Sequence, residues 1–258
     1  MNVKTYLLTT LLALTMSACS HIDENDRLIY VKPAEVKRHV LLEDFTGQRC
    51  VNCPKGTEVI EQLLQTYGDS TLIAVGIHGG PLGFAGNATQ KGLATTMGDE
   101  YYTHWKLEYQ PVGLVNRHGA VNYTDWAKAV REELAKSAPL NLMLSATLVS
   151  GQIEMALEAL GTDGKTTGKL QVWILEDGIT AMQLMPDGSA NANYVHNHVL
   201  RAAVNGTWGE DFTIGEGELK TVILTKAIEA DWNTKNLSVV AFVYNDQGVQ
   251  QAVKATVK

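Results

Sequence analysis

The chain has 258 residues, of which 45 % are hydrophobic, so it can form a substantial core and is not an intrinsically disordered protein. Its 21 basic and 28 acidic residues give a net charge of −7, which argues against nucleic acid or an anionic membrane surface as a partner. The sequence also lacks the G-x-S-x-G, G-x-x-x-x-G-K-[ST] and H-E-x-x-H motifs, which sets aside hydrolase, nucleotide-binding and zinc-protease functions of those kinds.

The N-terminus has the pattern of a targeting segment. A lysine precedes an apolar run from Tyr6 to Thr15, which is too short to span a bilayer. Residues 1–18 therefore predict a cleaved signal peptide. Two small residues stand directly before Cys19, and this resembles the lipobox of bacterial lipoproteins, which implies cleavage before Cys19 and lipid on its sulfur. An ordinary signal peptide followed by a chance cysteine is the alternative.

Residues 19–37 are rich in charged and polar side chains and predict a tether between the lipid and the folded part. Three early acidic residues, Asp23, Glu24 and Asp26, resemble the signal that sends some Bacteroidetes lipoproteins to the cell surface, although a solvated tether has the same composition. We therefore expect a protein anchored to the outer membrane, on its periplasmic face or on the cell surface.

A βαβ unit is predicted next. Residues 39–46 form a strand candidate, residues 53–69 carry apolar side chains at helical spacing, and residues 70–78 are a β-branched run typical of a buried strand. Cys50 and Cys53 fall at the first strand-to-helix turn. Once Cys19 is assigned to the lipid anchor, these two cysteines remain as a pair.

The next part of the chain continues this mixed pattern. A glycine-rich segment, 79–98, predicts a mobile loop and leads to a helix near 99–109. Residues 110–121 read as a proline-initiated strand, a turn and a short strand, and 123–137 as an amphipathic helix. From Pro139 onward apolar residues alternate with polar ones in six or more short runs, which is typical of a β-sandwich of immunoglobulin-like class.

The cysteine pair has three interpretations: a redox centre, a structural staple or a metal clip. The unpaired N–H groups at a helix N-terminus stabilise a thiolate on Cys50, and Arg49 beside it lowers the pKa further, while Cys53 suits the resolving role. A staple that closes so short a loop stabilises little. A metal needs more ligands, and His78, at the end of a predicted strand, is the best candidate for a thiolate partner or third ligand, although a structural role is the common one there.

Residues 38–136 resemble a thioredoxin-like domain, because "EDFTGQRCVNC" is followed by "YQPVGLVNRHG". The resemblance implies a cis-proline at Pro111 that faces the cysteines, and backbone groups of Gln110 that hold a substrate strand. Two features depart from the pattern. Arg49 stands where an aromatic residue is common, and Val51-Asn52 replaces Gly-Pro between the cysteines.

The lipobox, the C-x-x-C segment, "VNRHG" and the later "YVHNHVLRAAVNGTWGE" are together similar to the Omp28 family of Bacteroidetes outer-membrane lipoproteins. That resemblance implies an outer-membrane or surface location and an adhesin or receptor role. The expected architecture is an α/β thioredoxin-like domain at 38–138 followed by an all-β immunoglobulin-like sandwich at 139–258.

Two functions follow from these patterns. In the first, the protein is a thiol-disulfide oxidoreductase in which Cys50, Cys53 and Pro111 are catalytic and Gln110, Arg49 and His78 contact the substrate. In the second, it is a non-catalytic adhesin or receptor-type lipoprotein whose cysteine pair is structural. The expected partners are a protein substrate or surface protein and, through Cys19, the membrane. No nucleic acid, cofactor or metal is expected.

Overall fold

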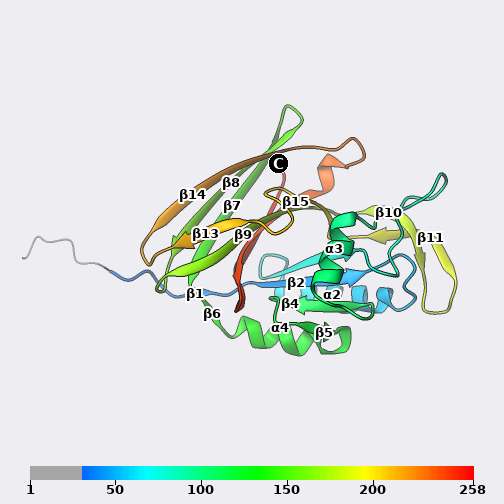
Figure 1. Ribbon diagram of the computed structural model, residues 1–258, viewed down its shortest axis with the longest axis horizontal. Coiled ribbons are helices and arrows are strands. Elements are labelled where there is room, and N and C mark those ends of the chain that lie inside the picture. Colours follow the sequence, from blue (N-terminus) through cyan, green and yellow to red (C-terminus); the bar gives the residue numbers. More distant parts are fainter. Residues whose placement is uncertain (1–30) are drawn as a thin grey trace, which may run out of the picture. The chain divides into compact units, whose positions relative to one another are not determined.

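The computed structural model describes residues 31–258, which fold into β-sheets with helices packed on them (Figure 1). The predicted signal peptide, Cys19 and most of the predicted tether fall in residues 1–30, outside the described part. The last two residues of the predicted tether form β1 (Val36–Lys37), which pairs with β6 (Ser137–Ala138). Within 31–258, no helix is long and apolar enough to cross a membrane.

The predicted βαβ unit is confirmed. Strand β2 (Val40–Thr46) runs parallel to β3 (Leu72–His78), and helix α2 (Cys53–Tyr67) connects them. Both strands are buried along their whole length, as expected of apolar runs in the middle of a sheet. The helix begins directly after Asn52 and has a proline in its first turn, where the missing N–H costs nothing.

One nine-stranded sheet contains the βαβ unit. Its order is β16-β15-β9-β12-β3-β2-β4-β5, with β13 pairing to β9. The additional strands are β4 (Val112–Val115), β5 (Ala120–Asn122), β9 (Thr166–Glu176), β12 (Val199–Ala203), β13 (Glu210–Ile214), β15 (Leu237–Asn245) and β16 (Gly248–Thr256). Because β12 pairs with both β3 and β9, the sheet runs through both predicted domains, whose boundary at 138/139 stays a prediction.

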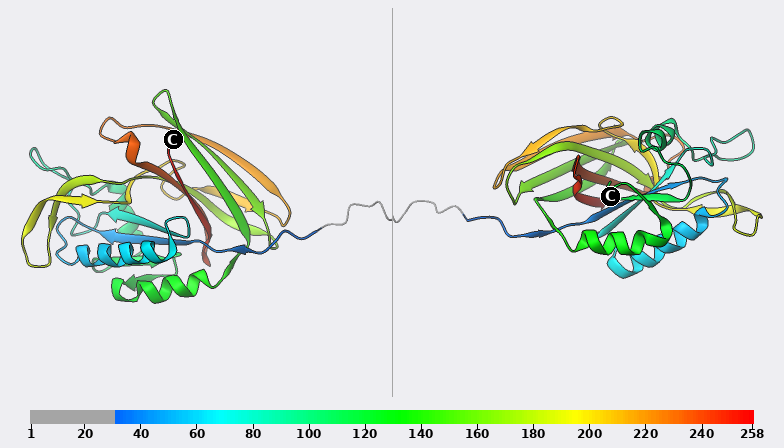
Figure 2. Two further views of the ribbon diagram at one scale, coloured as in Figure 1. Left: turned by 180° about the vertical axis from the view of Figure 1, so that it is seen from behind. Right: turned by 60° about the horizontal axis from the view of Figure 1, so that its bottom comes forward.

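Helices cover both faces of the sheet near β2 and β3 (Figure 2). Helix α2 and helix α4 (Trp126–Leu134), which follows a short 3-10 helix (Tyr123–Asp125), pack on one face around the fully buried Trp126. Helix α3 (Thr96–His104) packs on the other face. It begins earlier and ends sooner than the sequence pattern predicted. The cysteine turn thus lies above the α2 face of the sheet.

A second sheet has the order β14-β8-β7 and consists of β7 (Leu140–Val149), β8 (Gln152–Gly161) and β14 (Leu219–Ala227). The inward side chains of its alternating strands share a core with β9, β15 and β16. The C-terminal half is therefore β-rich and built from two packed sheets. The immunoglobulin-like class itself stays a prediction.

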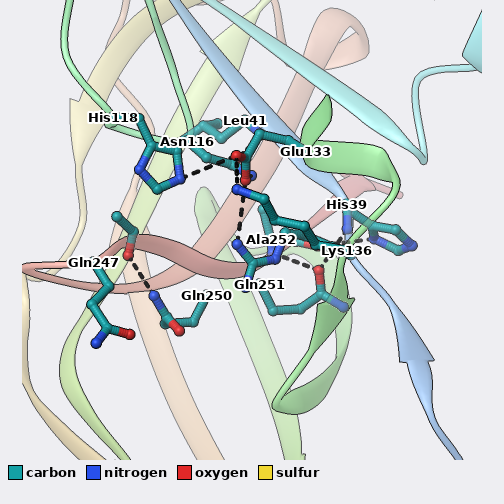
Figure 3. A network of polar contacts seen from close by, with 12 residues as sticks. His39, Leu41, Asn116, His118, Glu133, Lys136, Gln247, Gln250, Gln251 and Ala252 are labelled. Atoms are coloured by element: carbon teal, nitrogen blue, oxygen red, sulfur yellow. Dashed lines mark hydrogen bonds and ion pairs between the residues drawn. The ribbon is translucent and has the colours of Figure 1, made fainter. Parts of the chain in front are cut away.

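A polar network ties the last strands to the βαβ unit (Figure 3). The side-chain oxygen of Asn116 accepts a hydrogen bond from the Leu41 amide at 2.8 Å, and its nitrogen donates to Glu133 at 3.1 Å. The main-chain carbonyl of Asn116 accepts from the Val249 amide at 2.9 Å. One asparagine of the "VNRHG" segment therefore links β2, α4 and β16.

Candidate functional site: a buried disulfide beside a polar cavity

The two cysteines of the C-x-x-C motif form a disulfide at the start of α2, with Cα atoms 5.4 Å apart. Cys53 is the first residue of the helix. The Gln110–Pro111 peptide bond is cis, as the resemblance implied, and Pro111 packs against Gly56 in the first turns of α2. Cys50 and Cys53 are only 1 % and 2 % exposed, so both cysteines are shielded from solvent in the disulfide form.

The floor below the disulfide is polar because of how β2 and β3 alternate. Asp44 and Thr46 of β2 share a face with the inward residues that contact α2, and their register partners on β3 are Gly76 and His78. These four residues line a cavity of about 40 Å³, together with Cys53. A cavity of this volume is large enough for water. Because Gly76 has no side chain, space is left beside Asp44.

Burial changes the protonation of the groups around this cavity. Desolvation raises the pKa of Asp44 to about 8, so its carboxyl is mostly protonated at neutral pH. Desolvation, together with repulsion from His196, lowers the pKa of His78 to about 3. Desolvation also lowers the pKa of His196 to about 4. At neutral pH these three side chains are therefore predominantly uncharged.

Three polar atoms at the cavity lack a hydrogen-bond partner among the residues that the structure describes. They are Oδ1 of Asp44, Nδ1 of His78 and Nε2 of His196, and all three are buried. A buried polar group without a partner costs about 1–3 kcal/mol. Because the cavity is large enough for water, these atoms are placed to bind a water molecule or a ligand group beside the disulfide.

His196 reaches the site from the β-rich half of the chain. It ends strand β11 (Ala190–His196), and its ring meets the ring of His78 with centroids 5.2 Å apart. In the sequence His198 follows His196 by two residues, so on one strand the two side chains would share a face. The structure separates them, because His198 lies outside the strand at φ 57° and bonds to Asp177. No sequence spacing relates His196 to His78.

A hairpin covers the cysteine turn from one side. It consists of β10 (Ile179–Leu184) and β11, and the side chain of Gln183 on β10 is 2 % exposed. The Gln183 Nε2 atom donates to the carbonyl of Cys50 at 2.9 Å. The Leu184 amide donates to the Gln48 carbonyl at 2.9 Å. The hairpin was not anticipated as part of the site.

The glycine-rich segment covers the turn from another side. The Arg49 amide donates to the carbonyl of Leu82 at 3.0 Å, and the guanidinium of Arg49 lies 4.8 Å from the ring centroid of Phe84. The Gln110 side chain bonds to Leu82 and to Gly79, so it holds this segment in place. Arg49 and Gln110 therefore make internal contacts at the positions where substrate contacts were predicted.

The structure brings Cys53 and His78 to one cavity and places Pro111, Gln110 and Arg49 around the disulfide. Their assignment as catalytic or substrate-binding residues stays a prediction. In residues 31–258, no three His, Cys, Asp or Glu side chains are arranged to hold a metal ion. Asp44, His196 and Gln183 were missed, although Asp44 is recognisable as a carboxylate in an apolar strand six residues before Cys50.

Fold and site together define the class: a β-rich α/β protein with a disulfide turn at the start of a helix and a cover supplied by its C-terminal half. The model of the family "Outer membrane protein Omp28" matches residues 98–258, which is more than half of the chain, and the chain belongs to this family of outer membrane proteins. The match begins after the cysteine pair, so it does not bear on the redox chemistry. No curated protein matches the chain by sequence.

The solved structures that resemble the chain include two proteins from Porphyromonas gingivalis. "HBP35 of Porphyromonas gingivalis" is 16 % identical, with a TM-score of 0.67 over 87 % of this chain and 77 % of that one. A domain of the outer membrane lipoprotein Omp28 from Porphyromonas gingivalis is 29 % identical over 47 % of this chain and 89 % of that one, with a TM-score of 0.36. The first likeness shows a shared fold that extends across most of the chain.

Proposed function

We propose that this Omp28-family protein is a thiol-disulfide oxidoreductase of the cell envelope, built on a thioredoxin-like unit and acting through Cys50 and Cys53. The observation that carries the proposal is the polar cavity beside Cys53. A disulfide that only staples a turn needs no buried, protonated carboxyl next to it, whereas thiol exchange needs a proton donor and acceptor there.

The exchange proceeds in two displacements. A thiolate of a partner protein attacks Sγ of Cys50, the Cys50–Cys53 bond breaks, and the electron pair leaves on Cys53. Asp44 supplies a proton to the Cys53 thiolate and regains one from solvent. A second thiolate of the partner then attacks the partner's sulfur in the mixed disulfide and releases Cys50. The partner loses two electrons to form its own disulfide, and the cysteine pair gains them; the reverse steps reduce a substrate disulfide.

The membrane attachment rests on the lipobox-like residues before Cys19, in agreement with a family of outer membrane proteins. In the proposal, Cys19 carries the lipid and the following residues form the tether. Replacement of Cys19 by Ala is expected to release the protein from the membrane fraction of cells. Continued membrane association of Cys19→Ala would contradict the lipid anchor.

A second candidate function is a non-catalytic binding lipoprotein with a structural disulfide. It is favoured by the burial of both cysteines and by the bonds from Gln183 and Leu184 to the cysteine turn. In that case the partner binds to the β-rich half.

The reduction potential of the Cys50–Cys53 pair distinguishes the two functions. We expect a value between about −120 and −270 mV, measured by equilibration of the full chain in detergent with glutathione or dithiothreitol buffers. A value below about −300 mV would identify a resistant structural disulfide and would support the binding function. The potential of a Cys19→Ala protein serves as a control for effects of the anchor and detergent.

A further inference from the structure

The β10–β11 hairpin stands apart from the larger sheets. In the part of the chain that the structure describes, its two strands pair only with each other. Most residues of β11 are exposed, so the outer side of the hairpin faces solvent. Its buried apolar residues Ile179 and Ala181 form a small cluster with Leu93 and Val199. The hairpin is therefore attached by this small apolar base and by the contact of His196 with His78.

The other end of the hairpin lies along the cysteine turn like an added strand. The Leu184 amide donates to the Gln48 carbonyl, and the Gln48 side chain donates to the carbonyl of Met182 at 2.9 Å. The Gln183 side chain donates to the carbonyls of Cys50 and, at 3.3 Å, Gly47. Three of these bonds are accepted by the carbonyls of Gly47, Gln48 and Cys50, and the bond from Leu184 to Gln48 joins two main-chain groups as in a paired strand.

This arrangement closes the site. Thiol exchange requires the attacking sulfur to reach Sγ of Cys50, and access controls its rate. With Cys50 1 % exposed, a thiol of a partner protein reaches its Sγ atom only after a covering segment has moved, and the hairpin is hydrogen-bonded to the Cys50 carbonyl itself. The hydrogen bonds that hold the hairpin can be exchanged for bonds to water, so each contributes modestly to keeping it closed.

We propose that the β10–β11 hairpin is a lid over Cys50 that occupies the place taken during exchange by an extended, cysteine-containing segment of a partner protein. This inference rests on the proposed function and adds its regulation and substrate class. When the lid opens, the carbonyls of Gly47, Gln48 and Cys50 can each accept one amide hydrogen bond from a partner. Those of Gly47 and Cys50 keep the bonds that they accept within the turn. An extended polypeptide provides such amides at strand spacing, whereas a small thiol does not.

The lid is tested with Gln183→Ala, which removes the side-chain bonds to the cysteine turn. The matched control is Thr180→Ala, which changes an exposed side chain of the same strand. We expect dithiothreitol to reduce the disulfide of the full-length Gln183→Ala protein about tenfold faster than the wild type, because ordinary buried hydrogen bonds are lost. Thr180→Ala should react at the wild-type rate. Equal rates for the wild type and Gln183→Ala would overturn the lid.

Hydrogen exchange of the wild type provides a measurement that is independent of any variant. The Leu184 amide, which is bonded across the lid, should exchange through local opening and much faster than amides of β3. Exchange of Leu184 only through global unfolding would overturn the lid.

The substrate class is tested with two thiol probes of matched pKa, glutathione and an unstructured cysteine-containing peptide. We expect the peptide to reduce the disulfide at least tenfold faster. Equal rates would overturn the extended-segment inference. These rates are independent of the reduction potential. A potential below about −300 mV, together with faster reduction of Gln183→Ala, would overturn the redox function but leave the lid. A potential between about −120 and −270 mV, together with equal reduction rates for Gln183→Ala and the wild type, would overturn only the lid.

Discussion

The imidazole rings of His78 and His196 meet edge to face with centroids 5.2 Å apart, although β3 carries one and β11 the other. Both rings are buried, and both have a pKa lowered from 6.5, to about 3 for His78 and about 4 for His196. Two residues from opposite halves of the chain therefore become one neutral pair beside Cys53. The pair joins the β-rich half to the cysteine site.

The first prediction concerns acid stability. An unfolded histidine binds a proton below about pH 6.5, whereas His78 and His196 in the folded state bind one only near pH 3 and 4. The stability that these neutral histidines provide is thus fully present above pH 6.5 and is lost as the pH falls below it. Each contributes at most about 1.4 kcal/mol per pH unit to this slope. In His78→Gln, urea unfolding between pH 4 and 7 should show a shallower slope, and an unchanged slope would contradict the neutral pair.

The second prediction concerns Asp44, whose contribution to stability changes with pH in the opposite direction to that of the histidines. Its folded pKa of about 8 lies above the unfolded value of 3.8, so the folded state binds a proton that the unfolded state has lost. The contribution of Asp44 to stability is therefore greatest below pH 4 and is lost as the pH rises towards 8. At pH 7, Asp44→Asn should raise the free energy of unfolding by about 1–4 kcal/mol, measured with urea.

Asp177→Asn is the matched control for Asp44→Asn. Hydrogen bonds and the charge of His198 outweigh desolvation and lower the pKa of Asp177 to about 2, so its carboxylate is favoured in the folded state. Its replacement should lower stability at pH 7. Destabilisation by both replacements would show that Asp44 is ionised in the folded protein.

The third prediction concerns a buried ion pair on the other face of the sheet. The guanidinium of Arg117 donates to both carboxylate oxygens of Glu43, with the shortest bond at 2.9 Å, and both side chains are almost completely buried. Rings of Phe242 and Tyr244 lie over the guanidinium, at 4.8 and 4.2 Å from their centroids. Glu43→Gln should lower the free energy of unfolding by about 3–5 kcal/mol, because it leaves a buried charge without its partner.

The control for this pair is the double replacement Glu43→Met with Arg117→Met. It removes both charges and keeps apolar volume, so it should cost less than Glu43→Gln alone. If the double replacement lowers the free energy of unfolding as much as Glu43→Gln alone, the ion pair stabilises the fold by more than the pairing of a buried charge.

The local elements of the fold could be predicted because their signals lie within short windows. The strands β2 and β3 follow from short apolar runs, the helices at Cys53 and Trp126 from an apolar period of 3.6, and the strand at Val112 from the proline before it. The cis bond at Pro111 followed from a resemblance, not from periodicity. The placement of Cys50 and Cys53 at the start of α2 followed from the order of these elements.

The contents of the site could be predicted only in part, because tertiary pairing decides them. Strand β12 pairs with β3, and this pairing brings His196 to His78. The local spacing of residues does not predict this pairing. The same holds for Gln183, whose partner Cys50 is distant in sequence. Glu43 and Asp44 are adjacent in β2, so their side chains lie on opposite faces of the sheet. Glu43 binds Arg117 on one face, and Asp44 lines the cavity on the other. The sequence alone does not indicate which partner lies on which face.

The last prediction concerns Gly47, which lies in the turn before Cys50. A Cβ atom at this position would lie 2.2 Å from the carbonyl oxygen of Leu82, and this contact is with backbone that cannot rotate away. The segment around Leu82 must therefore move in Gly47→Ala, which breaks its bond to the Arg49 amide. We expect a loss of about 1–3 kcal/mol in the free energy of unfolding, as for other overpacked sites, and faster alkylation of the reduced cysteines. Gly215→Ala is the control, since the nearest atom to its Cβ is the Glu218 carboxylate at 3.5 Å. If Gly47→Ala and Gly215→Ala have equal stability and alkylation rates, the segment around Leu82 does not cover the disulfide in solution.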